Sequence, residues 1–222
     1  LCVSEKGREV PVVRLGGGKD VILLTARHHC CESTGSYVLE GMLEELMRDP
    51  IPNYTVIAVP FVDIDGVAQG DQGKNRIPHD HNRDYTDSPI YSSVRSIKAL
   101  IADNSVRYAF DLHSPWHFSG RNDKLFFVRG REEDMDKYLL LGELFEREAG
   151  GEAMKYSRED DIDPNTDWNT REDGPLMSFS GYCEGREGME LALSTETTYF
   201  GLHDDIVSQD KLVRTGLAFA RA

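Results

Sequence analysis

Short apolar runs that alternate with helical patterns constrain the fold of this chain more than any other feature. Tyr54–Val62 is a nearly continuous apolar run of strand length, as in a strand that is buried on both faces of a parallel sheet. Elsewhere apolar residues recur at helical spacing, as in Val38, Leu39, Met42, Leu43, Leu46 and Met47. Strands that alternate with helices predict an α/β fold with crossover connections.

The expected elements can be placed along the chain from periodicity and from Gly and Pro. After a hairpin in 8–15, we expect strands at 21–26, 54–62, 107–113, 124–128 and 189–196. We expect one helix from Ser33 or Thr34 to just before Pro50, and others at 89–102, 132–149 and 204–221. Two polar stretches, 63–88 and 157–175, lack periodicity, and loops of this length in a compact domain are usually functional or disordered.

Composition limits the class of protein. With 222 residues, 39% hydrophobic and 29% charged, the chain has the make-up of one soluble domain, and no apolar run approaches the roughly 20 residues of a membrane helix. A net charge of −14 argues against nucleic-acid and anionic-membrane partners. The chain begins with Leu1 rather than Met, which leaves room for an earlier segment. Oligomeric state is not readable.

The four cysteines do not have the spacing of a disulfide framework. Cys30 and Cys31 are adjacent and would form a strained pair, so we expect reduced thiols and a cytoplasmic protein. We also expect both residues to act as spacers rather than metal ligands. His79 and His81 are further candidate ligands, for which ordinary polar packing is the better interpretation.

Three predicted strands end in groups that zinc chemistry uses. His29 and Glu32 follow the first strand, His113 ends a later one and Glu196 ends the last. Because the carboxyl ends of neighbouring parallel strands meet at one edge of a sheet, we expect these groups to converge. His29, Glu32 and His113 would form a zinc site with an open position. Each signal alone has an ordinary explanation, a surface pair or a hydrogen-bonded cap, but together they favour a metal site.

Two further residues fit this chemistry. Metal bound at such a site lowers the pKa of water, and Glu196 could accept the proton that the water loses. Asp111 lies two residues before His113, on the same face of that strand, and could orient a ligand histidine through its second nitrogen. Trp116 and His117, just beyond, are expected in a pocket wall or, equally, in the core.

The first polar stretch offers a substrate anchor. It contains Asn82 and Arg83, and arginine has the planar fork that binds a carboxylate. Lys74 and Arg76 lie in the same stretch and could polarise a carbonyl or stabilise an oxyanion. The alternative is a solvated charged loop.

The order of four motifs resembles the zinc carboxypeptidase family, the carboxypeptidase A-like proteins. The motifs are His-x-x-Glu, Asn-Arg, a strand-terminal His and a late Glu. The resemblance is greatest to the cytosolic and bacterial branches of the family. The resemblance spans about residues 10–200. The stretch from Val59 to Gly66 is similar to the Pro-x-x-Asn-Pro-Asp-Gly stretch of the family. The other segments that carry the resemblance are Ala26–Glu32 followed by Gly41–Leu46, Asp111–His113 and Ser194–Phe200.

The resemblance implies a single zinc-carboxypeptidase-like catalytic domain over 1–222. Its fold would be a three-layer sandwich, with a mixed, mostly parallel sheet of about eight strands flanked by helices. The family implies one zinc ion on His29, Glu32 and His113.

The resemblance also assigns roles to other residues. Asn82 and Arg83 would hold the terminal carboxylate of the substrate, and Glu196 would be general base and then general acid. Lys74 or Arg76 would stabilise the oxyanion. Tyr182 is a candidate for the tyrosine that covers bound substrate, and Glu190 is the nearest rival to Glu196 but lies deeper in its strand.

The function that follows is a zinc metallocarboxypeptidase that hydrolyses the C-terminal peptide bond of a peptide. The alternative is a zinc amidohydrolase of the aspartoacylase and succinylglutamate desuccinylase type, acting on a small N-acyl amino acid. A non-catalytic peptide-binding relative is the third hypothesis. The sequence does not indicate which C-terminal residue would be removed.

Overall fold

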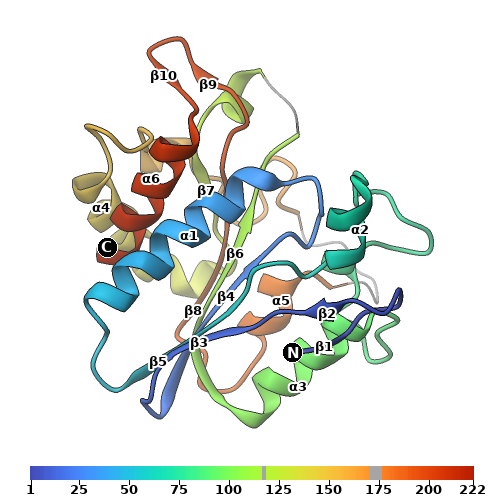
Figure 1. Cartoon of the computed structure of the whole chain (residues 1–222). Coiled ribbons are helices and arrows are strands. Elements are labelled where there is room, and N and C mark those ends of the chain that lie inside the picture. Colours follow the sequence, from blue (N-terminus) through green and yellow to red (C-terminus); the bar gives the residue numbers. More distant parts are fainter. Residues whose placement is uncertain (117–118, 171–176) are drawn as a thin grey trace. The chain divides into compact units, whose positions relative to one another are not determined.

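A computed structural model describes residues 1–116, 119–170 and 177–222 (Figure 1). His117 and the end of the second polar stretch lie outside the described residues. The chain forms two compact units. Unit 1 comprises Leu1–Ser33, Ile51–Asp111 and Glu172–Ala192, and unit 2 comprises Thr34–Pro50, Leu112–Arg171 and Leu193–Ala222. In the described ranges, no helix is both long and apolar enough to cross a membrane.

A six-stranded sheet carries the α/β fold and confirms the predicted fold class. Its strands, in spatial order, are β3 (Val13–Gly16), β5 (Tyr54–Val59), β4 (Asp20–Ala26), β6 (Ser105–His113), β8 (Leu191–Glu196) and β7 (Phe126–Val128). The sheet is mixed: β4 pairs with β5 in parallel, whereas β3 with β5 and β7 with β8 are antiparallel.

The main sheet is smaller than the eight strands that the family resemblance implied. The remaining described strands form two separate two-stranded sheets, β1 (Cys2–Val3) with β2 (Glu9–Val10) and β9 (Gly201–Leu202) with β10 (Asp205–Ile206). Each of these strands is two residues long.

Unit 1 has a hydrophobic core made by two helices and by strands of the sheet. α3 (Ser92–Asp103) buries Val94, Ile97 and Ile101, whose spacing places them on one face of the helix. α5 (Phe179–Glu184) buries Phe179 completely in the same cluster. Full burial of each such side chain contributes about 1.5–3 kcal/mol.

The first polar stretch is more structured than expected, because it contains α2 (Ile64–Gln69) and the 3-10 turn η1 (His81–Arg83). Asp63 caps α2 by accepting a hydrogen bond from the amide of Gly66 at 2.9 Å, and Gly70 ends it with a left-handed φ of 69°. A helix of six residues is too short to show an amphipathic repeat, so only its caps could have revealed it.

Unit 2 contains most of α1 (Ser33–Arg48), with α4 (Met135–Glu148) and α6 (Gln209–Arg221). α6 starts later than expected, because β9 and β10 occupy the preceding residues. The short turns that complete the described elements are η2 (Gly120–Asp123), η3 (Glu132–Asp134) and η4 (Arg158–Asp160).

Glycines let α1 and α6 touch backbone to backbone within unit 2 (Figure 1). A Cβ on Gly41 would lie 1.9 Å from the carbonyl oxygen of Val213, and one on Gly216 would lie 2.0 Å from that of Val38. These distances leave no room for any side chain, so the two helices depend on both glycines.

We expect Gly216→Ala to destabilise the protein. The new methyl group would force α1 and α6 apart, at a cost of about 1–3 kcal/mol, although alanine by itself favours a helix by about 1 kcal/mol over glycine. Urea unfolding measures the change. Gly17→Ala is the control, because nothing lies within 4 Å of a Cβ at that position. A Gly216→Ala protein as stable as the parent would contradict the packing described for these helices.

Candidate metal and substrate site

A tight turn after β4 brings His29 and Glu32 together. The strand ends at Ala26, and Arg27 takes a left-handed φ of 64° that turns the chain. The amide of Glu32 donates to the carbonyl of His29 at 3.1 Å, and His29 Nδ1 lies 2.9 Å from Glu32 Oε1. The two predicted ligands therefore face each other at the start of α1.

The other nitrogen of His29 faces a carboxylate that the sequence analysis did not identify. His29 Nε2 lies 3.5 Å from Asp80 Oδ1. Burial would raise the pKa of Asp80, but the hydrogen bond from His29 and the charges of His29 and Arg83 lower it overall. A carboxylate behind a histidine fixes its ring orientation and tautomer, as metal-binding histidines require.

Asp80 also organises the turn that carries Asn82 and Arg83. Its Oδ1 accepts a hydrogen bond from the amide of Arg83 at 3.1 Å and caps η1. Asp80 stands three residues before Arg83, which is the spacing of a helix cap and a signal that the sequence contained. One carboxylate therefore connects a predicted metal ligand to the predicted substrate anchor.

Asn82 and Arg83 have different surroundings. Asn82 is buried, and its side-chain oxygen accepts a hydrogen bond from the amide of Phe179 at 3.0 Å. Arg83 is exposed at the protein surface. Its guanidinium is therefore accessible to a carboxylate, whereas Asn82 anchors the turn to the first residue of α5.

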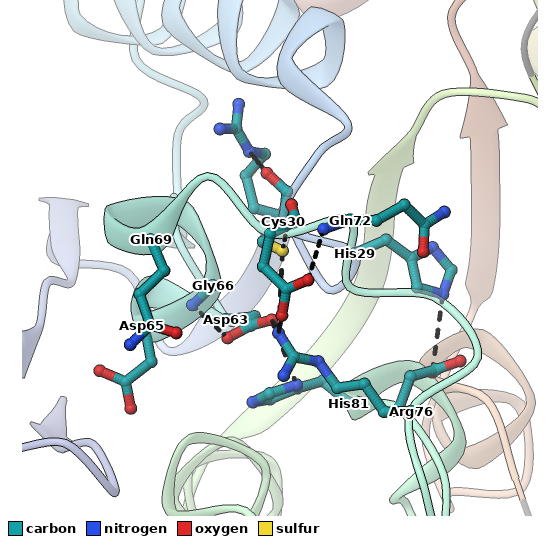
Figure 2. Close-up of polar contacts among 12 residues, drawn as sticks. His29, Cys30, Asp63, Asp65, Gly66, Gln69, Gln72, Arg76 and His81 are labelled. Atoms are coloured by element: carbon teal, nitrogen blue, oxygen red, sulfur yellow. Dashed lines mark hydrogen bonds and ion pairs between the residues drawn. The ribbon is translucent and has the colours of Figure 1, made fainter.

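The structure separates the two candidate oxyanion cations. Lys74 Nζ lies 2.6 Å from Glu32 Oε1, next to the predicted metal ligands. Arg76 instead contacts Asp63 at 2.5 Å (Figure 2) and Asp71 at 2.9 Å. Burial would lower the pKa of Arg76, but these two carboxylates raise it overall. Arg76 thus holds the loop together.

Glu196 and Glu190 lie at opposite ends of β8. Glu196 is the last residue of the strand and is opposite Phe126 of β7 in unit 2. Glu190 immediately precedes the strand in unit 1 and forms an ion pair with Arg107. Glu190 is therefore engaged at the end of the strand away from Glu196.

Tyr182 lies among packing residues of unit 1. Its ring centroid is 5.6 Å from that of Tyr85, and the ammonium of Lys98 lies 4.9 Å from it. Burial raises the pKa of Tyr182. This setting is that of a partly buried core side chain, and the role of Tyr182 in covering bound substrate stays a prediction.

Asp111, expected to orient a ligand histidine, holds the buried His28. Its Oδ1 lies 2.8 Å from His28 Nδ1 and accepts a hydrogen bond from the hydroxyl of Thr25 at 2.9 Å. His28 Nε2 lies 2.8 Å from the hydroxyl of Tyr85. This buried network connects β4, β6 and the segment after η1 within unit 1, and pattern analysis did not identify it because its members are far apart in sequence.

Two histidines of unit 1 have both ring nitrogens next to polar groups. Those of His28 contact Asp111 and Tyr85. Those of His29 face Glu32, its predicted fellow ligand, and Asp80. A carboxylate at the second nitrogen is the usual setting of a metal-binding histidine. His113 is the last residue of β6, and its role as the third ligand stays a prediction.

Comparison with known proteins gives the fold of metallo-carboxypeptidases. No family model matches the sequence. The chain is 25% identical over 161 residues to cytosolic carboxypeptidase 2 from Danio rerio, covering 63% of this chain and 22% of that protein. A metallo-carboxypeptidase from Burkholderia cenocepacia superposes with a TM-score of 0.77 at 16% identity, covering 99% of this chain and 61% of that one.

A second kind of hydrolase shares the fold. Succinylglutamate desuccinylase from Vibrio parahaemolyticus superposes with a TM-score of 0.62 at 14% identity, covering 94% of this chain and 69% of that one. The resemblance to zinc carboxypeptidases, noted first from motifs, is confirmed by the fold and by the similarity to the cytosolic carboxypeptidase. The chain spans 22% of the length of that curated relative and 61% of the bacterial carboxypeptidase chain.

We expect Asp80→Asn to weaken zinc binding by about 10- to 100-fold, the usual cost of removing the carboxylate behind a metal-binding histidine. The amide can still accept the hydrogen bond that caps η1, so the turn should persist. Competition with a chromophoric chelator measures the affinity. Asp87→Asn, at an exposed position of the same segment, is the control. Equal affinities in the two variants would remove Asp80 from the site.

His81 generates a prediction about acid stability. It is buried against Tyr91, with ring centroids 3.7 Å apart, and burial lowers its pKa to about 4, although Asp63 partly opposes this. The unfolded chain takes up the proton near pH 6.5, so stability falls as the pH drops from 6.5 to 4, by up to about 3 kcal/mol, and is unaffected above 6.5.

His81→Phe keeps the stacked ring and removes the titrating group. We expect it to lose less stability than the parent, by about 2 kcal/mol, between pH 7.5 and pH 5. Urea unfolding at the two pH values measures this loss. His203→Phe, at an exposed histidine, is the matched control and should keep the acid sensitivity of the parent. The same acid sensitivity in His81→Phe would show that another group is responsible.

Proposed function

We propose that this chain is a zinc-dependent metallocarboxypeptidase that hydrolyses the C-terminal peptide bond of a peptide. The observation that carries the proposal is the double contact of Asp80, with His29 on one side and with the amide of Arg83 on the other. It links a histidine prepared for metal binding to an exposed guanidinium on the neighbouring turn. An exopeptidase needs these two functions at a fixed separation.

His29, Glu32 and His113 would hold the zinc ion. The fit is supported by the donor set, two imidazoles and one carboxylate, and by the approach of His29 Nδ1 to Glu32 Oε1 within unit 1. When bound, zinc supplies Lewis acidity that polarises the scissile carbonyl and makes water easier to deprotonate.

The protein's own residues would do the remaining work. The guanidinium of Arg83 would bind the terminal carboxylate of the peptide, with Asn82 holding the turn in place. Glu196 would accept a proton from the attacking water and pass it to the leaving amine. Lys74 is the preferred cation for the developing oxyanion, because its partner Glu32 is a proposed zinc ligand, whereas Arg76 pairs with Asp63 and Asp71.

A zinc amidohydrolase that acts on an N-acyl amino acid is the second candidate. The fold similarity to a succinylglutamate desuccinylase favours it. The reaction would also break an amide bond beside a carboxylate, which Arg83 could bind. The cellular setting is proposed to be cytoplasmic, supported by four cysteines that form no disulfide and by the similarity to a cytosolic carboxypeptidase.

A substrate comparison tests the proposal. The zinc-loaded protein is assayed on blocked peptides that differ in their C-terminal residue, and on N-acetylaspartate and N-succinylglutamate. Release of a C-terminal amino acid from peptides is the expected result. Turnover of the acyl amino acids alone would replace the proposal with the second candidate, and no zinc binding would exclude both enzymes.

We expect Glu196→Gln to lower kcat by about 100- to 10,000-fold with little change in zinc content, because glutamine cannot accept the proton. Glu190→Gln is the control on the same segment. It removes a surface ion pair with Arg107 and should leave kcat within about threefold, since such pairs contribute little. Comparable activity in both variants would overturn the role of Glu196.

A further inference from the structure

Lys74 occupies an unusual place for a lysine, because it pairs with a buried carboxylate that is itself a predicted metal ligand. Its Nζ lies 2.6 Å from Glu32 Oε1. The side chain of Glu32 is 1% exposed and that of Lys74 is 17% exposed. At this burial, solvent and salt screen the charge of Lys74 much less than that of a surface lysine.

The loop before Lys74 lies directly against the turn that carries His29. A Cβ on Gly73, whose φ is 84°, would lie 2.6 Å from the amide nitrogen of Cys30 and 2.7 Å from its sulfur. The Cys30 thiol donates to the carbonyl of Asp71 at 3.0 Å. Gly73 therefore permits a close approach that no other residue would allow.

Arg76 fixes the same loop through a second set of contacts. Arg76 bonds to Asp63, the cap of α2, and to Asp71, and its terminal nitrogen also lies 3.8 Å from the sulfur of Cys30 (Figure 2). Residues on both sides of Lys74 are thus fixed to the turn after β4 and to α2. These contacts on both sides of Lys74 fix the position of its ammonium group.

We propose that Lys74 is a built-in counter-cation of Glu32 that weakens the hold of the site on its metal, with Cys30 and Arg76 as positioning residues. The inference rests on the proposed function, since it takes Glu32 as a ligand. The ammonium uses part of the electron density of the carboxylate and repels a divalent cation nearby. Lys74 would then have two effects: it weakens metal binding, and it places a cation beside the reacting groups.

The opposite role would be purely structural. If Lys74 only fixed the orientation of Glu32, its removal would leave the ligand disordered and would weaken metal binding. The two roles therefore predict opposite signs for one measurable quantity, the zinc affinity of a variant without the charge.

The experiment measures zinc affinity by competition with a chromophoric chelator, without any assay of activity. We expect Lys74→Met to bind zinc at least about tenfold more tightly than the parent. Lys74→Arg, which keeps the charge, should stay within about threefold of the parent, and so should Lys19→Met, at an exposed lysine of unit 1. Arg76→Gln should shift affinity in the same direction as Lys74→Met but by less.

Each outcome decides the inference. Unchanged or weaker zinc binding by Lys74→Met would overturn the counter-cation, and unchanged binding by Arg76→Gln would overturn the positioning role. If Lys74→Met does not unfold cooperatively, Lys74→Gln takes its place. If the parent binds no zinc, the proposed function fails together with this inference, whereas zinc binding that is indifferent to Lys74 defeats this inference alone.

Discussion

The pairing of His29 with Glu32 is the constraint on which the rest of the site depends. The turn after β4 brings an imidazole nitrogen within 2.9 Å of a carboxylate oxygen, and neighbouring groups attach to this pair. Asp80 contacts the far side of His29, while Lys74 contacts Glu32. Asp80 and Lys74 both come from the polar stretch after β5, which contributes few side chains to the hydrophobic core. That stretch is ordered by the contacts of its charged side chains with the turn that carries His29 and Glu32.

Buried carboxylates explain how this stretch can be ordered without hydrophobic periodicity. Asp84 is fully buried and accepts hydrogen bonds from the amides of Ile90 and Tyr91, at 2.9 Å each, while His79 Nε2 lies 2.6 Å from it. Asp63 caps α2 and also bonds to Arg76. A buried carboxylate with several donors is stable where an unpaired one would not be. Polar partners thus take the place that apolar packing has in the sheet.

The predictable part of this structure is the part governed by local rules. Periodicity predicted the long helices and the main strands, and the spacing of three residues in His29-x-x-Glu32 predicted that the two side chains meet. α2 was missed because six residues show no repeat. The choice between Lys74 and Arg76 depends on Asp63 and Asp71, whose side chains reach Arg76 only after the loop has folded. No rule based on sequence spacing predicts these side-chain partners. The contact of His28 with Tyr85 could not be predicted for the same reason.

The cations of the first polar stretch differ in what they contact. In a chain of net charge −14, a loop with several cations could be read as a general anion-binding surface. The structure indicates a narrower arrangement, since Lys74 and Arg76 contact carboxylates of the protein while Arg83 exposes its guanidinium. A protein with strong negative charge repels most anions at long range. Under the proposed function, a carboxylate that reaches Arg83 would belong to a ligand that other contacts also hold, as the terminus of a peptide would be.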